Sequence, residues 1–160
     1  MGNGESLWQF SLTLYAAPEV QQACLDLQDN HGADVNLVLF LLYQGSLGRQ
    51  LAQETIQTIV QETCSFRERV IQPIRALRKS LKSKKYSLEH GEDSLYQQML
   101  SLELSAEKLA QTHLQCINFT ADNDQPTAQA AEKNLYAYAK LLNIQKPNTA
   151  IKTLLSCMES

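Results

Sequence analysis

Hydrophobic residues recur every three or four positions along most of the chain, the spacing that places them on one face of an α-helix. The segments between these runs are short and polar, and several contain Gly or Pro. Short connections favour antiparallel neighbours, so the sequence predicts an all-α fold: a single-domain bundle of six or seven mostly antiparallel helices over residues 1–160. The predicted helices span residues 7–16, 18–32, 34–44, 51–84, 94–117, 126–142 and 148–158.

Short polar side chains and helix-breaking residues mark the predicted helix ends. Three polar residues precede apolar runs and are predicted N-caps. Gly45 and Gly48 are expected to break the chain after the third helix. Pro73 lies inside the long segment 51–84, where it removes a hydrogen bond and clashes with the carbonyl of Arg69, so a kink or break is expected there. The predicted N-caps are Ser6, Asp34 and Asn148.

Two predicted helices have informative apolar faces. Residues 35–43 are apolar on nearly every side apart from Asn36, which indicates a central, buried helix. In the segment 94–117 the helical period gathers seven residues on one face, and that face is predicted to point into the core. The seven are Leu95, Met99, Leu102, Ala106, Leu109, Ala110 and His113.

Composition supports a folded helical chain. Hydrophobic residues make up 44% of the 160 residues and charged residues 19%, which is ordinary for a globular protein and excludes a disordered one. The chain has 25 Leu, 17 Gln and 15 Ala, all good helix formers, and only 6 Gly and 4 Pro to punctuate short strands. Residues 7–82 form the more distinctive part of this single domain, and residues 94–158 supply less specific C-terminal helices.

Charge is distributed in blocks of alternating sign, although the net charge is only −3. Residues 1–48 and 86–125 are acidic, whereas residues 49–85 and 126–160 are basic, and such blocks usually pair within one fold. The basic stretch 67–85 could follow a phosphate backbone. It has almost no interleaved aromatic residues for base stacking, so nucleic acid is not the partner that the sequence favours.

The cysteines and the apolar runs bear on location. Cys24, Cys64, Cys116 and Cys157 are 40 to 52 residues apart and lack the paired short spacing of a zinc site, so no metal and no cofactor are predicted. Cys24 and Cys116 fall on apolar faces, which predicts reduced, buried thiols and a cytoplasmic protein. No apolar run is long enough to cross a membrane, and a membrane partner is not expected.

Several polar residues occupy positions where the helical period predicts core. Arg67 and Arg78 share the face of Ile74, and Asn36 lies in the first turn of the central helix. A buried guanidinium needs a carboxylate or a route to water, which leaves two interpretations: an internal ion-pair network that orients helices, or an anion-binding pocket lined by arginines. The candidate polar set is Asp29, Asp34, Asn36, Arg67, Arg75, Arg78 and Glu103.

Catalytic motifs are missing from the sequence. We find no nucleophile elbow, zinc-protease motif, phosphate-binding loop or dinucleotide fingerprint. His113 is interpreted as a core histidine with satisfied hydrogen bonds. Glu103 and Glu107 are one helical turn apart, but the Glu-x-x-His motif of carboxylate metal sites in helical bundles does not accompany them. The sequence therefore favours a protein that is not an enzyme.

The N-terminal half resembles a family of uncharacterised proteobacterial proteins of about this length, whose signature reads LWxFSL…LQDxxGxDVNLLLF. The resemblance covers about residues 7–82 and departs at Tyr43-Gln44-Gly45, where such proteins tend to carry a tryptophan. It implies a bacterial, cytoplasmic, helical protein and supplies no activity. The matching residues are Trp8 to Leu12, Tyr15, Pro18, Val20, Cys24 to Asp29, Gly32, Asp34 to Leu37, Pro73 to Arg78, and Lys82.

Three functional hypotheses follow. The first is a non-enzymatic cytoplasmic protein that acts through contact with a protein partner or as a homo-oligomer. The second is a protein, which could also be an enzyme, that binds a small molecule or a small anionic ligand through Asp34, Asn36, Arg75 and Arg78. The third is nucleic-acid binding through residues 67–85. An exposed apolar patch would favour the first hypothesis, and a concave pocket holding both Arg75 and Arg78 would favour the second.

Overall fold

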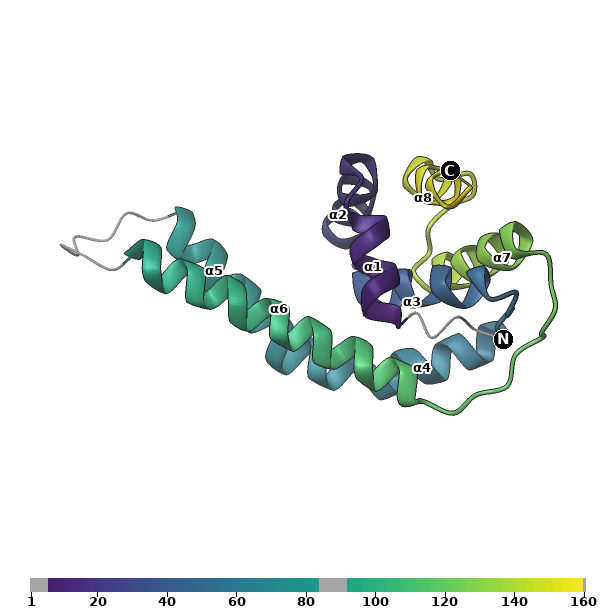
Figure 1. Cartoon of the computed structure of the whole chain (residues 1–160), viewed down its shortest axis with the longest axis horizontal. Coiled ribbons are helices and arrows are strands. Elements are labelled where there is room, and N and C mark those ends of the chain that lie inside the picture. The colour runs from purple at the N-terminus through teal and green to yellow at the C-terminus, as the bar shows by residue number, and fades with distance from the viewer. Residues whose placement is uncertain (1–5, 84–91, 160) are drawn as a thin grey trace.

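The computed structural model describes residues 6–83 and 92–159, and over these residues the protein is an all-α domain, as predicted. Helices α4, η1 and α5 follow one another without interruption, so the described residues form seven helical rods (Figure 1). The helices are α1 (Leu7–Tyr15), α2 (Pro18–His31), α3 (Val35–Ser46), α4 (Gln53–Phe66), the π-helical η1 (Arg67–Ile71), α5 (Gln72–Ser83), α6 (Glu92–Cys116), α7 (Thr127–Leu141) and α8 (Thr149–Met158).

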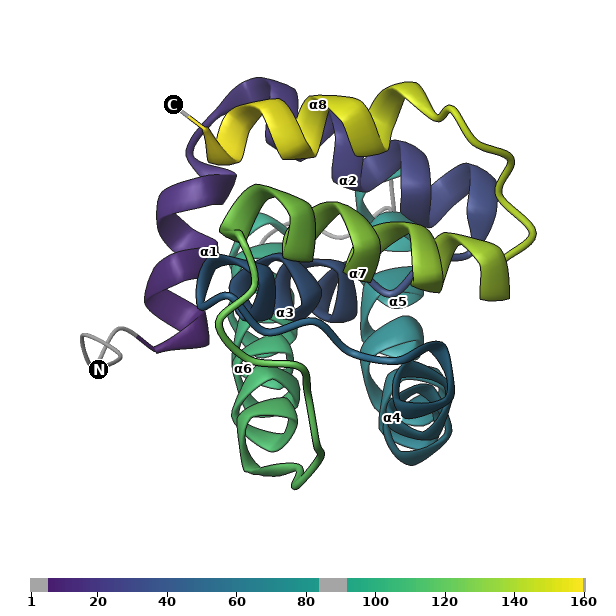
Figure 2. The same ribbon diagram turned by 90° about the vertical axis from the view of Figure 1, so that its right-hand side faces the viewer.

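Helix α3 forms the centre of the body of the molecule. It packs on α7 most extensively and also contacts α1, α2 and α6, while α8 lies against α2 (Figure 2). Phe40, Leu41 and Leu42 are fully buried, which confirms the prediction that this helix is apolar on nearly every side because it is surrounded. The three predicted N-caps are also confirmed: the side chains of Ser6, Asp34 and Asn148 each accept a backbone N–H from the first turn of their helix.

Helices α5 and α6 pair side by side and extend together beyond the body as a two-helix arm (Figure 1). With 25 residues, α6 is about 37 Å long, and its C-terminal part reaches the body, where it contacts α1, α3 and α4. The arm is the main departure from the predicted bundle, because the part of it farthest from the body is not enclosed by other helices.

The predicted interruption near Pro73 takes the form of a π-turn. The backbone N–H of Gln72 donates to the carbonyl of Arg67, five residues earlier, and the helix continues into α5 without a break. A π-turn widens the helix by one residue and so accommodates the missing N–H and the bulky ring of proline.

The prediction that Gly45 breaks the chain is wrong. Gly45 lies inside α3, and its role is to let α7 approach: a Cβ atom at this position would lie 2.4 Å from the Cα of Ala131. Gly48, with a positive φ of 71°, does occupy the turn after α3. The sequence alone cannot distinguish the roles of Gly45 and Gly48, because the close approach of a second helix leaves no signal in the neighbouring residues.

The predicted inner face of α6 is also wrong. The leucines at 95, 102 and 109 are exposed to 44%, 56% and 59%, and His113 is exposed as well. Of the predicted set only Ala106 is buried, and the face that points inward otherwise carries Glu103, Gln111 and Leu114. Helical periodicity identifies an apolar face but does not say whether the core of the same molecule covers it.

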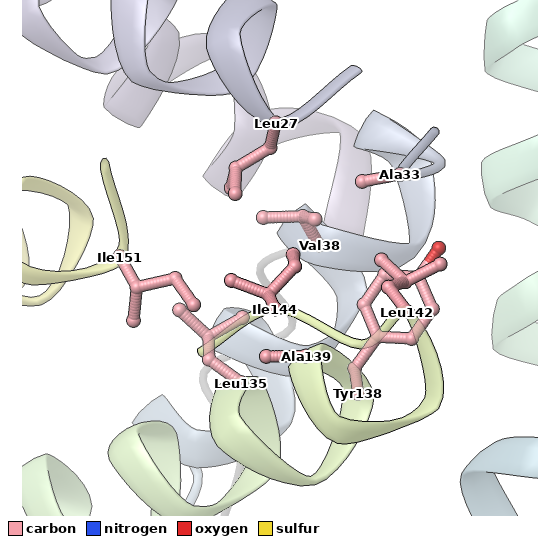
Figure 3. A pocket seen from close by; sticks show the side chains of 9 residues that line it. All are labelled: Leu27, Ala33, Val38, Leu135, Tyr138, Ala139, Leu142, Ile144 and Ile151. Atoms are coloured by element: carbon pink, nitrogen blue, oxygen red, sulfur yellow. The ribbon is translucent and has the colours of Figure 1, made fainter. Parts of the chain in front are cut away.

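The body is tightly packed. The internal space between α2, α3, α7 and α8 shown in Figure 3 has a volume of only about 10 Å³ and is lined by apolar side chains such as Val38, Leu135 and Ile151. This is too small for a ligand. Of the helices in residues 6–83 and 92–159, none has the length and apolar character that a membrane span requires.

We expect Gly45→Ala to lower the free energy of unfolding by about 1–3 kcal/mol, because the added methyl group overlaps the backbone of α7. In an uncrowded helix interior the same change is stabilising. Urea unfolding measures the difference, with Ser65→Ala on the exposed side of α4 as the control. An unchanged or more stable Gly45→Ala variant would contradict the close approach of α3 and α7.

Candidate functional site

The candidate polar residues do not form one site in the structure. Arg75, Arg78 and Glu103 meet in the arm, Asp34 and Arg67 meet at the turn between α2 and α3, and Asn36 lies in the body. Asp29 joins none of these groups. It is exposed on α2, where its carboxylate accepts a hydrogen bond from the neighbouring Gln28, so its expected place near an inner face is wrong.

The first group is an ion-pair network between α5 and α6. Arg75 Nε donates to Glu103 Oε1 at 3.1 Å, and Arg75 Nη2 donates to Glu107 Oε1 at 3.0 Å. Arg78 binds both carboxylate oxygens of Glu103, through Nε and Nη2. The spacings of three residues on α5 and four on α6 place each pair on one helical face, so the two faces meet in register. Glu107, which the candidate set omitted, is thus part of the network.

The protonation of this network follows from its contacts. The hydrogen bond to Glu103 raises the pKa of Arg78. Burial tends to raise the pKa of Glu103, but the hydrogen bonds from Arg78 and Arg75 outweigh burial and hold it below the ordinary glutamate value. Burial raises the pKa of Glu107, although Arg75 acts in the opposite direction. Glu103 is therefore ionised at neutral pH, and its carboxylate is the group that binds both arginines of the network.

A cleft of about 240 Å³ separates the arm from the body on the side of this network. The charged residues form one wall, and Leu25 of α2 and Leu104 of α6, both partly solvent-exposed, contribute apolar surface to it. Tyr15 of α1 lines the same cleft. The two arginines lie in a concave site, but their side chains are already bound to carboxylates and only 17% and 16% exposed.

The second group stabilises the turn between α2 and α3. Arg67 Nη2 donates to the carbonyls of Gly32 and Ala33 at 3.1 and 3.0 Å, so it binds the end of α2 where a carboxylate was expected. Asp34 caps α3 through the N–H of Asn36, and its own N–H donates to the hydroxyl of Tyr138 at 2.9 Å. Burial raises the pKa of Tyr138 to about 12, so the phenol is neutral.

The third group consists of buried amides that join helices. Gln111 Nε2 donates to Asn36 Oδ1 at 3.1 Å, and Ser11 donates to Gln111 Oε1 at 3.3 Å, which connects α1, α3 and α6. Asn134 of α7, which the sequence analysis missed, is fully buried; it accepts from the N–H of Leu51 and donates to two backbone carbonyls. Its only sequence signal is an asparagine in an Ala-rich helix. These groups are satisfied and structural.

The side of the arm that points away from the body is apolar. Lys79 of α5 and Leu104 of α6 line the cleft. On an α-helix, the residue two positions earlier lies about 200° away around the helix axis, which is nearly the opposite side. Leu77 and Leu102 therefore face away from the body, and Leu95 and Leu109 share the face of Leu102 because seven residues make nearly two full turns. All four side chains are between 44% and 59% exposed. We call Leu77, Leu95, Leu102 and Leu109 the outer face of the arm.

The ion-paired groups of the arm lie on the cleft side, while Lys82, Asp93 and Lys108 are exposed elsewhere on the two helices. The network of Arg75, Arg78, Glu103 and Glu107 and the exposed Lys79 all border the cleft toward the body. The exposed residues of α6 between positions 94 and 105 are only Ser, Leu and Gln. A helix in contact with water usually carries charges outward, so an uncharged stretch with exposed leucines is unusual for a solvated helix.

A second groove, the potential metal ligands and the cysteines offer no better candidate for a functional site. An open groove of about 430 Å³ near Arg49 and Gln44 is lined by amides and by Phe40 and Phe119. Within the described residues, no three His, Cys, Asp or Glu side chains gather as a metal site would require. Cys24 is buried as predicted, but Cys116 is exposed, since it follows the misassigned face of α6.

The fold and its surfaces define a small all-α protein with a two-helix arm that is ion-paired on one side and apolar on the other. Residues 6–114 match a family described as protein of unknown function (DUF2390), and the chain belongs to this family. The matched region includes the ion-pair network and the outer face and ends before α7. No curated protein and no solved structure matches the chain.

We expect Arg78→Leu to lower the free energy of unfolding by about 2 kcal/mol, because Glu103 then keeps only Arg75. For a chain of this size the melting temperature should fall by roughly 4–8 °C, measured by circular dichroism. Lys79→Leu, an exposed neighbour on the same helix, is the control and should change it little. Unchanged or increased stability of Arg78→Leu would instead indicate a strained arginine reserved for a ligand.

The stability contributed by Glu103 should depend on pH. Its pKa is lower in the folded than in the unfolded chain, so its contribution is present above the unfolded pKa and disappears as the pH falls through the folded pKa. Glu103→Gln should therefore destabilise the protein at about pH 7 and much less at about pH 3. Urea unfolding at both pH values tests this, with the exposed Glu132→Gln as control. An equal loss at both pH values would contradict the assignment.

Proposed function

We propose that the protein is a non-enzymatic binding module that contacts another protein through the outer face of its arm. The observation that carries this proposal is the exposure of Leu77, Leu95, Leu102 and Leu109 on the side of two paired helices that faces away from the cleft. Exposing four leucine side chains on one side of two paired helices is unfavourable in water, and interface centres are typically depleted of charge in the same way.

We also propose that the protein is located in the cytoplasm of a bacterium. The resemblance to proteobacterial proteins implies a bacterial cytoplasmic chain. All four cysteines are free, which supports a reducing compartment. In that setting the partner is another cytoplasmic protein, or a second copy of this chain.

A second candidate function is the binding of a small anionic ligand in the cleft between arm and body. The presence of Arg75 and Arg78 in one cleft favours it. The carboxylates of Glu103 and Glu107 offset both positive charges, and a ligand would have to compete with them for the same N–H groups. This weighs in favour of the protein-binding function.

Nucleic-acid binding through residues 67–85 receives less support. Six of the eight basic residues of this stretch lie in the part of the chain that the structure describes. Three of them, Arg67, Arg75 and Arg78, have guanidinium groups that bind carbonyls or carboxylates of the protein itself. Fewer cations are left to neutralise phosphates than the sequence suggests.

Site-specific photo-crosslinking in the bacterium that encodes the protein tests the proposed function. Benzoylphenylalanine in place of Leu102 should give discrete, light-dependent adducts. The same group in place of Leu12, which is 48% exposed on α1, should not. No adduct from position 102, or the same adducts from both positions, would show that the outer face is not a binding surface.

A further inference from the structure

The outer face belongs to a layer two helices wide. Leu77 comes from α5, while Leu95, Leu102 and Leu109 come from α6. The network of Arg75, Arg78 and Glu103 holds these two helices together from the other side. A two-helix layer with one apolar side is half of a four-helix bundle, whose core forms where two such layers meet.

We propose that the protein which covers the outer face is a second copy of this chain, and that two arms pack face to face into an intermolecular four-helix bundle. This inference rests on the proposed function, because it names the partner for the same surface. Three features of that surface support a second copy.

The first feature is the lack of charge. Two-fold pairing places the same surface patch opposite itself, so a charged patch would face its own sign. The exposed positions of α6 from 94 to 105 are Ser, Leu and Gln, and Glu103, the one charged residue among these positions, is turned inward to the arginines. Self-association along this part of α6 therefore brings no like charges together.

The second feature is the spacing of the leucines. Leu95, Leu102 and Leu109 are seven residues apart, the repeat that keeps one side chain per two turns on the seam of a helical bundle. Ser101 and Ser105 flank Leu102 on α6 and are small and exposed, so they leave room for the leucines of a facing helix. The spacing suits a straight helical partner of the same kind.

The third feature is the size of the layer. Residues 67–83 extend for about 25 Å opposite α6, and two helices are about 20 Å wide, which gives a footprint of about 500 Å² per copy. Stable interfaces bury roughly 600–1,000 Å² of accessible surface on each partner, and accessible area exceeds a flat footprint. The two-helix layer as a whole is therefore at the lower end of the size that a dimer needs, which corresponds to a weak to moderate affinity.

Sedimentation equilibrium of the purified full chain across the micromolar range tests the proposal. The wild-type mass should rise with concentration from 18.0 kDa toward twice that value. Leu102→Glu should remain at the monomer mass, because it places two carboxylates together in the centre of the contact. Leu12→Glu, an equally large change at a similarly exposed leucine of α1, should dimerise like the wild type. If Leu102→Glu fails to fold by circular dichroism, Leu102→Ser takes its place and should weaken dimerisation at least tenfold.

The outcomes separate the two proposals. A wild-type chain that stays monomeric throughout, a dimer that persists in Leu102→Glu, or a dimer weakened less than tenfold in its replacement Leu102→Ser overturns the second-copy inference. If the adduct from position 102 then contains a different protein, the binding function stands with another partner. If position 102 gives no adduct at all, both proposals fail.

Discussion

The carboxylate of Glu103 between Arg75 and Arg78 is the contact on which the arrangement of the arm depends. A carboxylate that binds two guanidinium groups must point toward them, and this restricts the rotation of α6 about its own axis. Glu103 and Leu102 are about 100° apart around the helix, so the ion pairs set part of this rotation, and the inward packing of Gln111 and Leu114 sets the rest. The exposure of the leucines at 95, 102 and 109 is thus a joint consequence of the ion pairs and of the packing of the C-terminal part of α6 on the body.

The body uses polar contacts in a different way. Its apolar core is contributed by α3 and the helices around it, and non-directional packing alone does not specify their relative positions. Directional hydrogen bonds add this information: Asn134 ties α7 to the chain on both sides of the turn after α3, and Gln111 ties α6 to α1 and α3. Arg67 and Tyr138 hold the turn between α2 and α3 from two further helices. Buried polar residues therefore set helix positions in the body and helix rotation in the arm.

The two surfaces of the arm suit different uses. The cleft side is charged but internally neutralised, so its groups are occupied with the fold. The outer side is unpaired and apolar, and its association with another surface would release water from four leucines. The π-turn at Arg67–Ile71 connects the arm to α4 without a loop, so the arm is a continuous extension of the body and presents the outer face in a defined direction.

The sequence by itself determined the fold class, the helix boundaries to within a few residues, the three N-caps and the central place of α3, because these follow from local periodicity and local capping chemistry. It also indicated that a buried arginine such as Arg78 needs a carboxylate or a route to water, without naming the partner. Only the tertiary structure decided that Gly45 serves the approach of α7, that Asn134 is a buried tie and that the leucines of α6 face outward. Each of these depends on which distant segment lies nearby, and an apolar face looks the same in a sequence whether its own core or another molecule covers it.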